Sequence, residues 1–284
     1  MTHLLAPPRP ASYAGVVAIA KLAAVVAAVT AAATPAPSAP LPRSPAPVVR
    51  ALIATDASLR AAFRNWHPRT AVPPPGVTLH ALYEQRLYRL LSRDVALWRA
   101  AVRRLPRRLA DHARDLVVAH RELVRITPPL RTRAPRVGRA APPDRLLRWY
   151  REAARRFRVP WHVLAAVNFV ESAFGKLRST SAAGAQGPMQ FMPSTWREYG
   201  LGGNVHDPHD AILGAANYLH AAGAPGDIGR ALYAYNPSPY YVDAVLRYAR
   251  QIHRDAHVFF ELYSWQVFVR TAAGERRVTG PGLD

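Results

Sequence analysis

Twenty-seven prolines divide the chain of 284 residues into separate stretches. Proline fixes φ and lacks an amide hydrogen, so it is accepted in the first turn of a helix but not in its interior. Proline-rich runs occupy residues 34–47, 72–76 and 127–143, and single prolines punctuate the remainder. This spacing predicts a mainly α fold built from helices with sharp ends.

The N-terminal residues have the character of a targeting segment. Residues 14–33 are small and apolar apart from Lys21, and the stretch ends in three alanines. Such a stretch is typical of a signal peptide or of an N-terminal anchor, so residues 1–33 predict an exported protein. Residues 34–50 are rich in proline and alanine and predict an extended linker. The chain has no cysteine, which excludes disulfides and thiol chemistry.

The formal net charge of +20 is concentrated in one part of the chain. Residues 43–158 contain 26 arginines against 8 acidic residues, whereas residues 159–255 are balanced. Apolar residues at helical spacing predict an Arg-rich helical segment over residues 51–126, followed by a linker over 127–143. Basic residues interleaved with aromatic ones are missing, so nucleic acid is excluded as a partner. Anionic wall polymers or lipid headgroups remain as candidate partners. The alternative is that the arginines only form the solvated face of the helices and bind no partner.

Residues 144–255 predict a compact group of short helices. Helix starts are indicated at Pro160, at Asp207 with Pro208, and at Ser238 with Pro239. Residues 256–284 form a C-terminal tail in which apolar and polar residues alternate from Trp265. Residues 272–274 there predict the turn of a short β-hairpin.

Glu171 is the candidate catalytic residue. Leu164 and Val167 precede it by seven and four residues, which places all three on one helix face. A carboxyl group among apolar neighbours resists ionisation, so its pKa rises and it can donate a proton near neutral pH. Taken alone, the same pattern more often describes a glutamate near a helix end that points into water.

The segment after Glu171 adds candidate binding residues. Residues 179–192 read STSAAGAQGPMQFM, in which Gly184 and Gly187 permit a tight turn and a close approach of ligand. Gln190 offers both a donor and an acceptor, which suits an amide-bearing sugar. Further on, Tyr235 and Asn236 end a helix where the wall of a cleft is expected.

Together these motifs resemble the soluble lytic transglycosylase family, and most closely its actinobacterial branch. The resemblance covers residues 144–255. It rests on a Glu-Ser pair, on a Gly-x-x-Gly-x-Met-Gln stretch and on an Ala-Tyr-Asn triplet. The residues that carry it are Glu171, Ser172, Gly184, Gly187, Met189, Gln190, Ala234, Tyr235 and Asn236. Pro188 stands where the family usually has leucine.

The resemblance implies a lysozyme-like helical domain that cleaves peptidoglycan. Glu171 would protonate the glycosidic oxygen and then, as a base, activate the muramic 6-hydroxyl, which closes a 1,6-anhydro ring without water. Tyr235 would hold Glu171, while Gln190 and Asn236 would bind the sugar. Ser172 and Met189 would contact the substrate or support the wall of its cleft.

No cofactor or metal is expected. The His/Asp-rich run 206–210 predicts a capped helix start rather than a metal site, because it lacks ligand spacing such as HExxH.

Two other functions fit the same residues. A hydrolytic muramidase, similar to goose-type lysozyme, would need a second carboxylate opposite Glu171, and Asp207, Asp210 and Asp227 are the acids available. A cell-wall-binding scaffold would instead act through the Arg-rich helices and need no intact catalytic set.

Overall fold

The computed structural model describes residues 33–130 and 135–283, and these ranges form eleven helices and one antiparallel hairpin. The elements are α2 (Pro45–Arg64), α3 (Pro75–Arg93), α4 (Val95–Val102), α5 (Arg107–Ile126), α6 (Pro143–Phe157), α7 (Trp161–Ser172), α8 (Pro193–Tyr199), α9 (Pro208–Ala221), α10 (Ile228–Tyr235), α11 (Pro239–Arg254), α12 (His257–Ser264), β1 (Phe268–Thr271) and β2 (Gly274–Arg277). The predicted mainly α fold and C-terminal hairpin are confirmed. The predicted signal peptide or anchor lies outside the described residues, except for residue 33. Within the described ranges, no helix has the length and apolarity that a membrane crossing needs.

Local side chains set the starts of the helices around the candidate site. The carboxylate of Asp207 accepts hydrogen bonds from the backbone N–H groups of His209 and Asp210, at 2.8 and 3.1 Å. Asp227 accepts one from the N–H of Arg230 at 2.8 Å, and Ser238 caps α11 in the same way. These bonds satisfy amide groups that have no partner within the helix. The helix starts predicted at residues 207 and 238 are therefore confirmed.

The linker predicted over residues 34–50 is wrong at its C-terminal end. Helix α2 already begins at Pro45, and Val48 inside it is fully buried. The segment before it is also in contact with the fold, since the guanidinium of Arg86 donates to the carbonyl of Pro37 at 3.0 Å. A proline in the first helical position explains the early start, because its missing N–H would have no partner there anyway.

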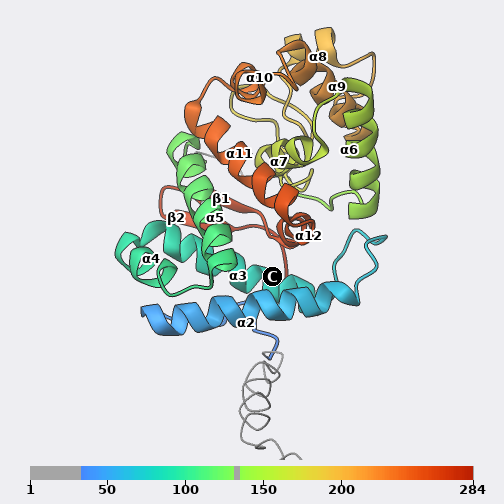
Figure 1. The fold of residues 1–284 in the computed structure, drawn as a ribbon. Coiled ribbons are helices and arrows are strands. Elements are labelled where there is room, and N and C mark those ends of the chain that lie inside the picture. The colour runs from blue at the N-terminus through green and yellow to red at the C-terminus, as the bar shows by residue number, and fades with distance from the viewer. Residues whose placement is uncertain (1–32, 131–134, 284) are drawn as a thin grey trace, which may run out of the picture.

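The Arg-rich helices and the later helices share one continuous hydrophobic core. Helix α11 packs against α7 on one side and against α5 on the other (Figure 1). Asp115 of α5 is buried and accepts hydrogen bonds from Arg247, Arg250 and Gln251 of α11. Residues 51–126 are therefore part of the folded body that carries Glu171, not a stalk beside it.

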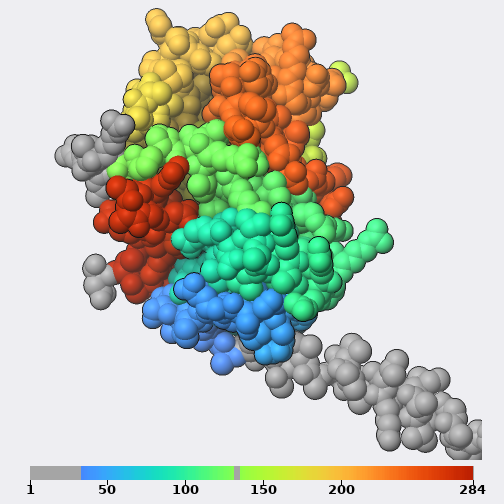
Figure 2. Space-filling view, turned by 90° about the vertical axis from the view of Figure 1, so that its left-hand side faces the viewer, coloured from blue at the N-terminus to red at the C-terminus, as the bar shows by residue number. Residues whose placement is uncertain are grey.

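The C-terminal tail is likewise integrated. Its first part forms α12, whose Phe259 and Tyr263 are fully buried. The hydroxyl of Tyr263 lies 2.9 Å from the carbonyl of Ala71 and 3.1 Å from that of Ala141, so it links both halves of the chain. The hairpin pairs Phe268 with Arg277. In the space-filling view this C-terminal part lies between the N-terminal helices and the segments around α8 to α10 (Figure 2).

Candidate active site

Glu171 is held at the C-terminal end of a largely buried helix. Leu164 and Val167, the predicted neighbours on its face, are fully buried. The helix ends at Ser172, one residue after Glu171, and the next two residues, Ala173 and Phe174, both adopt a left-handed backbone conformation. The chain therefore turns away directly after the carboxylate, and the side chain of Glu171 is left half-buried at the end of the apolar helix.

The carboxylate of Glu171 has one hydrogen-bond partner among the described side chains, the hydroxyl of Tyr241. This hydroxyl donates to Oε1 of Glu171 at 2.6 Å. Burial raises the pKa of Glu171 to about 7, and the bond from Tyr241 opposes part of that rise. Burial disfavours the charged form, whereas a donated hydrogen bond favours it. A carboxyl group with such a pKa can give up a proton near neutral pH and take it back.

The role predicted for Tyr235 is wrong. Its hydroxyl donates to the backbone carbonyl of Met189 at 2.6 Å, and the contact to Glu171 belongs to Tyr241. Burial, together with the nearby Glu171, raises the pKa of both tyrosines well above the ordinary value, so both hydroxyls stay protonated donors. Tyr241 lies in the first turn of α11, six residues beyond the predicted residue, and no local pattern separates it from its tyrosine neighbours.

Ser172 and Met189 are both buried and bonded within the protein. Ser172 is buried; its hydroxyl donates to the carbonyl of Pro188 and accepts from the N–H of Gly175 at 2.8 Å. Met189 is fully buried. Asn168 adds a second bond to the carbonyl of Pro188, at 2.8 Å. Their burial fits the supporting role expected for Ser172 and Met189, and contact with the substrate stays a prediction.

Gln190 is placed at the surface of this loop by an unusual backbone. Its φ is +51°, which a residue other than glycine rarely adopts. Its side-chain amide donates to the carbonyl of Gly187 at 2.8 Å, which leaves the side-chain oxygen as an acceptor. Gly187 allows the close approach of another part of the protein, the backbone of Val205, and not the approach of a ligand that the sequence predicted. A Cβ at residue 187 would lie 1.9 Å from the carbonyl oxygen of Val205.

Asn236 caps the C-terminal end of α10 and is half-buried. It stands next to Tyr235, as the motif predicted. Gly184 has a positive φ of +93° and open space around its Cα, so it serves the turn of the loop. The structure thus brings Glu171, Gln190 and Tyr235 to one region through the contacts of Tyr235 with the loop and of Tyr241 with the acid.

A cavity of about 190 Å³ reaches Glu171 from the side of the Arg-rich helices. Its wall includes Arg89 of α3, His120 of α5 and Glu275 of β2. Glu275 accepts from Arg89 at 2.6 Å and lies 3.1 Å from the ring of His120. Sequence reasoning missed these residues, because they are up to 186 positions apart and carry no shared motif.

The acids considered as a second catalytic carboxylate are occupied elsewhere. Asp207 and Asp227 cap α9 and α10, and Asp210 accepts from the N–H of Asn204 at 2.9 Å. Across residues 33–130 and 135–283, the single group of metal-ligating side chains that lie close enough together is Glu84, His112 and Glu261. It is buried between α3, α5 and α12, where burial raises the pKa of Glu84 well above its ordinary value. A neutral Glu84 can share its proton with Glu261, which accounts for this cluster without an ion.

Residues 148–258 match the family model of the transglycosylase SLT domain. This part of the chain is therefore a domain of the soluble lytic transglycosylase family, a family that acts on peptidoglycan. The match ends three residues beyond the boundary predicted at residue 255, in the first turn of α12. No solved structure matches the chain.

Proposed function

We propose that this protein is a lytic transglycosylase that cleaves the bond between N-acetylmuramic acid and N-acetylglucosamine in peptidoglycan. The observation that carries the proposal is the carboxyl group of Glu171. It is half-buried, its pKa is raised to about 7, and the hydroxyl of Tyr241 holds it at 2.6 Å. A general acid needs a pKa near the working pH and a fixed position, and Glu171 has both.

The proposed reaction uses this one carboxyl group twice. Glu171 donates its proton to the glycosidic oxygen, and the 2-acetamido group of the muramic residue stabilises the cationic anomeric carbon. Glu171, now a carboxylate, then accepts the proton of the muramic 6-hydroxyl as that oxygen closes the 1,6-anhydro ring. Tyr241 donates to Glu171 in both states and so keeps it oriented. The engagement of Asp207, Asp210 and Asp227 in backbone caps supports a mechanism with one acid.

Binding of the sugar is assigned to Gln190 and Asn236. The side-chain oxygen of Gln190 and the amide of Asn236 can each pair with an acetamido or hydroxyl group. Tyr235 fixes the loop that carries Gln190, because its hydroxyl is bonded to the carbonyl of the preceding residue, Met189.

Mass spectrometry of muropeptides released from purified peptidoglycan tests the mechanism, with Glu171→Gln beside the native chain. We expect products that end in 1,6-anhydro-muramic acid from the native protein and none from the variant. Products ending in a reducing muramic sugar would instead identify a hydrolytic muramidase, in which water is the acceptor. Equal release from both proteins would show that Glu171 is not the catalytic acid, and no release from either would favour a wall-binding scaffold.

The Arg-rich segment is proposed to contact anionic groups of the envelope, either wall polymers or lipid headgroups. Arg103 and Arg104 follow α4 and Arg107 begins α5; all three are exposed, and none forms an ion pair within the described part of the chain. Co-sedimentation with purified walls and with phosphatidylglycerol vesicles distinguishes the two surfaces. Replacing the three arginines with glutamine should weaken the contact, and the loss should shrink as salt rises.

Export is proposed from residues 1–33. The mass of the protein isolated from its native cells would show whether this segment is removed, as for a signal peptide, or retained, as for an anchor. Recovery of the protein in the cytosol would contradict export.

A further inference from the structure

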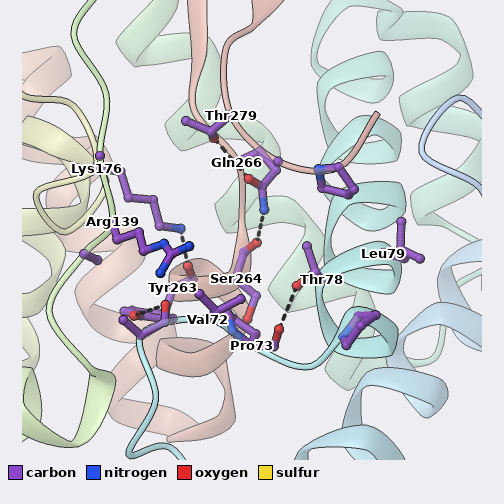
Figure 3. A pocket seen from close by; sticks show the side chains of 16 residues that line it. Val72, Pro73, Thr78, Leu79, Arg139, Lys176, Tyr263, Ser264, Gln266 and Thr279 are labelled. Carbon is purple, nitrogen blue, oxygen red and sulfur yellow. Dashed lines mark hydrogen bonds between the residues drawn. The ribbon is translucent and has the colours of Figure 1, made fainter. Parts of the chain in front are cut away.

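A second pocket, of about 430 Å³, lies among segments that the catalytic motifs do not include (Figure 3). Its wall comes from residues 71–79 at the start of α3, from residues 138–140, from Lys176 and Tyr263, and from residues 279–281 near the C-terminus. It shares only Gln266 with the cavity that reaches Glu171. The pocket therefore needs an explanation separate from the glycosidic reaction.

The charged residues of this pocket are both cations. Lys176 and Arg139 line it, and none of its lining residues is acidic. The amine of Lys176 donates to the carbonyl of Tyr263 and, at 2.7 Å, to that of Trp265. No ion pair involves Lys176 within residues 33–130 and 135–283. Burial lowers its pKa to about 7. A buried ammonium group with two neutral acceptors has a third N–H to offer and gains from a nearby anion.

Arg139 supplies the second positive group from a rigid segment. The carbonyl of Arg139 accepts a hydrogen bond from Arg178 at 3.0 Å, and the N–H of Gly138 bonds to the carbonyl of Lys176 at 2.8 Å. These bonds fix the backbone beside Lys176. The Arg139 side chain is exposed and forms no hydrogen bond in the part of the chain that the structure describes. In Figure 3 the nitrogen-bearing ends of Lys176 and Arg139 both point toward the middle of the pocket.

The rest of the wall is apolar or already satisfied. Val72, Pro73 and Leu79 supply apolar surface on the α3 side. The amide of Gln266 donates to the carbonyl of Ser264 at 2.8 Å, and its oxygen accepts from Thr279 at 3.0 Å. The pocket thus combines two basic side chains, neither of which forms an ion pair among the described residues, with a wall that offers apolar surface. A carboxylate attached to a short, methyl-bearing body has this chemistry.

We propose that this pocket binds the free carboxyl end of an uncrosslinked stem peptide of peptidoglycan. The terminal alanine offers the carboxylate to Lys176 and Arg139, and its methyl group lies against the wall formed by Val72 and Leu79. The inference rests on the proposed action on peptidoglycan, whose stem peptides present such ends. A second contact with the same polymer keeps the catalytic domain near its glycan strand, because the next binding event becomes intramolecular.

Lysine-selective ¹³C labelling of the full chain tests the site directly. The chain has only two lysines, Lys21 and Lys176, so two side-chain signals are expected. The variant Lys21→Arg assigns them without touching the pocket. We expect a saturable shift of the Lys176 signal on titration with N-acetyl-D-alanyl-D-alanine, and none with the same peptide as its amide. The exposed Arg139 is the matched second site, and Arg139→Gln should weaken binding about threefold.

Several outcomes would overturn the proposal. These are no saturable shift with the acid, an equal shift with the amide, or tighter binding of a simple fatty acid such as octanoate.

Binding of the peptide in this pocket does not depend on catalysis. Glu171→Gln should bind the peptide as the native chain does, even if its muropeptide release is abolished. If the native protein released no 1,6-anhydro product, the proposed reaction would be refuted. The titration of the Lys176 signal would still show whether the pocket binds the peptide.

Discussion

Replacing Glu171 with glutamine should stabilise the folded protein at alkaline pH. Burial raises the pKa of Glu171 from an ordinary 4.5 to about 7. A difference of that size between folded and unfolded chain corresponds to about 3 kcal/mol, since each pKa unit is worth about 1.4 kcal/mol. Glutamine has nearly the same shape as a protonated glutamate and never ionises, so the variant lacks the cost of burying a charge.

The direction of this stability change follows from the pH at which the folded and the unfolded chain each bind the proton of Glu171. Below pH 4.5 the carboxyl group is protonated in the folded and the unfolded chain, and the pKa difference costs nothing. Between pH 4.5 and 7 the unfolded chain has released the proton and the folded chain retains it, so native stability falls as pH rises. Above pH 7 the loss is complete. The advantage of Glu171→Gln should therefore be small at pH 5 and close to its full value at pH 8.

Urea unfolding of both proteins at pH 5 and at pH 8, followed by circular dichroism, measures this difference. The difference in unfolding free energy between the two proteins is compared at each pH, because the contributions of the other titrating groups are the same in both and cancel. Glu198→Gln on α8 is the matched control, because Glu198 is an exposed glutamate. The control should change stability by less than about 0.5 kcal/mol at either pH.

A constant gap between Glu171→Gln and the native protein at the two pH values would refute the reasoning, because it would mean that Glu171 ionises normally in the folded chain. A gap that widened toward pH 5 would reverse the sign and show a carboxylate stabilised by its surroundings.

Three further predictions concern the partners of the site. Tyr241→Phe should lower kcat about tenfold or more, since hydrogen bonds to charged groups contribute about 1.5–3 kcal/mol. Because the lost hydrogen bond had lowered the pKa of Glu171, the variant should also move the basic limb of the pH–rate profile to higher pH. Tyr235→Phe should leave that limb in place, and pH–rate profiles of both variants measure the difference. Asp115→Asn should cost about 1.5–3 kcal/mol of unfolding free energy because it removes the charge that Arg247 and Arg250 bond to. The partly exposed Asp111→Asn should cost less than about 0.5 kcal/mol, and urea titration of both variants measures the difference. A fragment of residues 144–255 lacks α5 and α12, so it should unfold at a lower temperature than the full chain or fail to fold. Thermal unfolding measures this, and a cooperative transition of the fragment at the temperature of the full chain would contradict a shared hydrophobic core.

Much of the catalytic domain could be predicted from local patterns. Pro160, Asp207 and Ser238 mark helix starts because capping is decided within four residues along the chain. Glu171 could be singled out because helical spacing alone places Leu164 and Val167 beside it. The hairpin was visible in the alternation that follows Trp265.

The long-range partners could not be predicted in the same way. Tyr241 and Tyr235 are both tyrosines near a helix boundary, and only the path of α11 across α7 decides which hydroxyl meets Glu171. Likewise, nothing local in Asp115 indicates that it pairs with arginines more than 130 positions later.

The sequence by itself therefore determined the helices, the position of the acid along one of them and the family of the domain. The tertiary structure decided that the Arg-rich helices and α12 belong to the folded body that carries Glu171, that the Tyr241 hydroxyl donates to Glu171, and that Lys176 lies in a pocket with no ion-pair partner among the described residues. The physical reason is that caps and helical periodicity depend on neighbours a few residues away. Burial and side-chain partners depend instead on which distant segments meet, and burial is what raises the pKa of Glu171 and lowers that of Lys176.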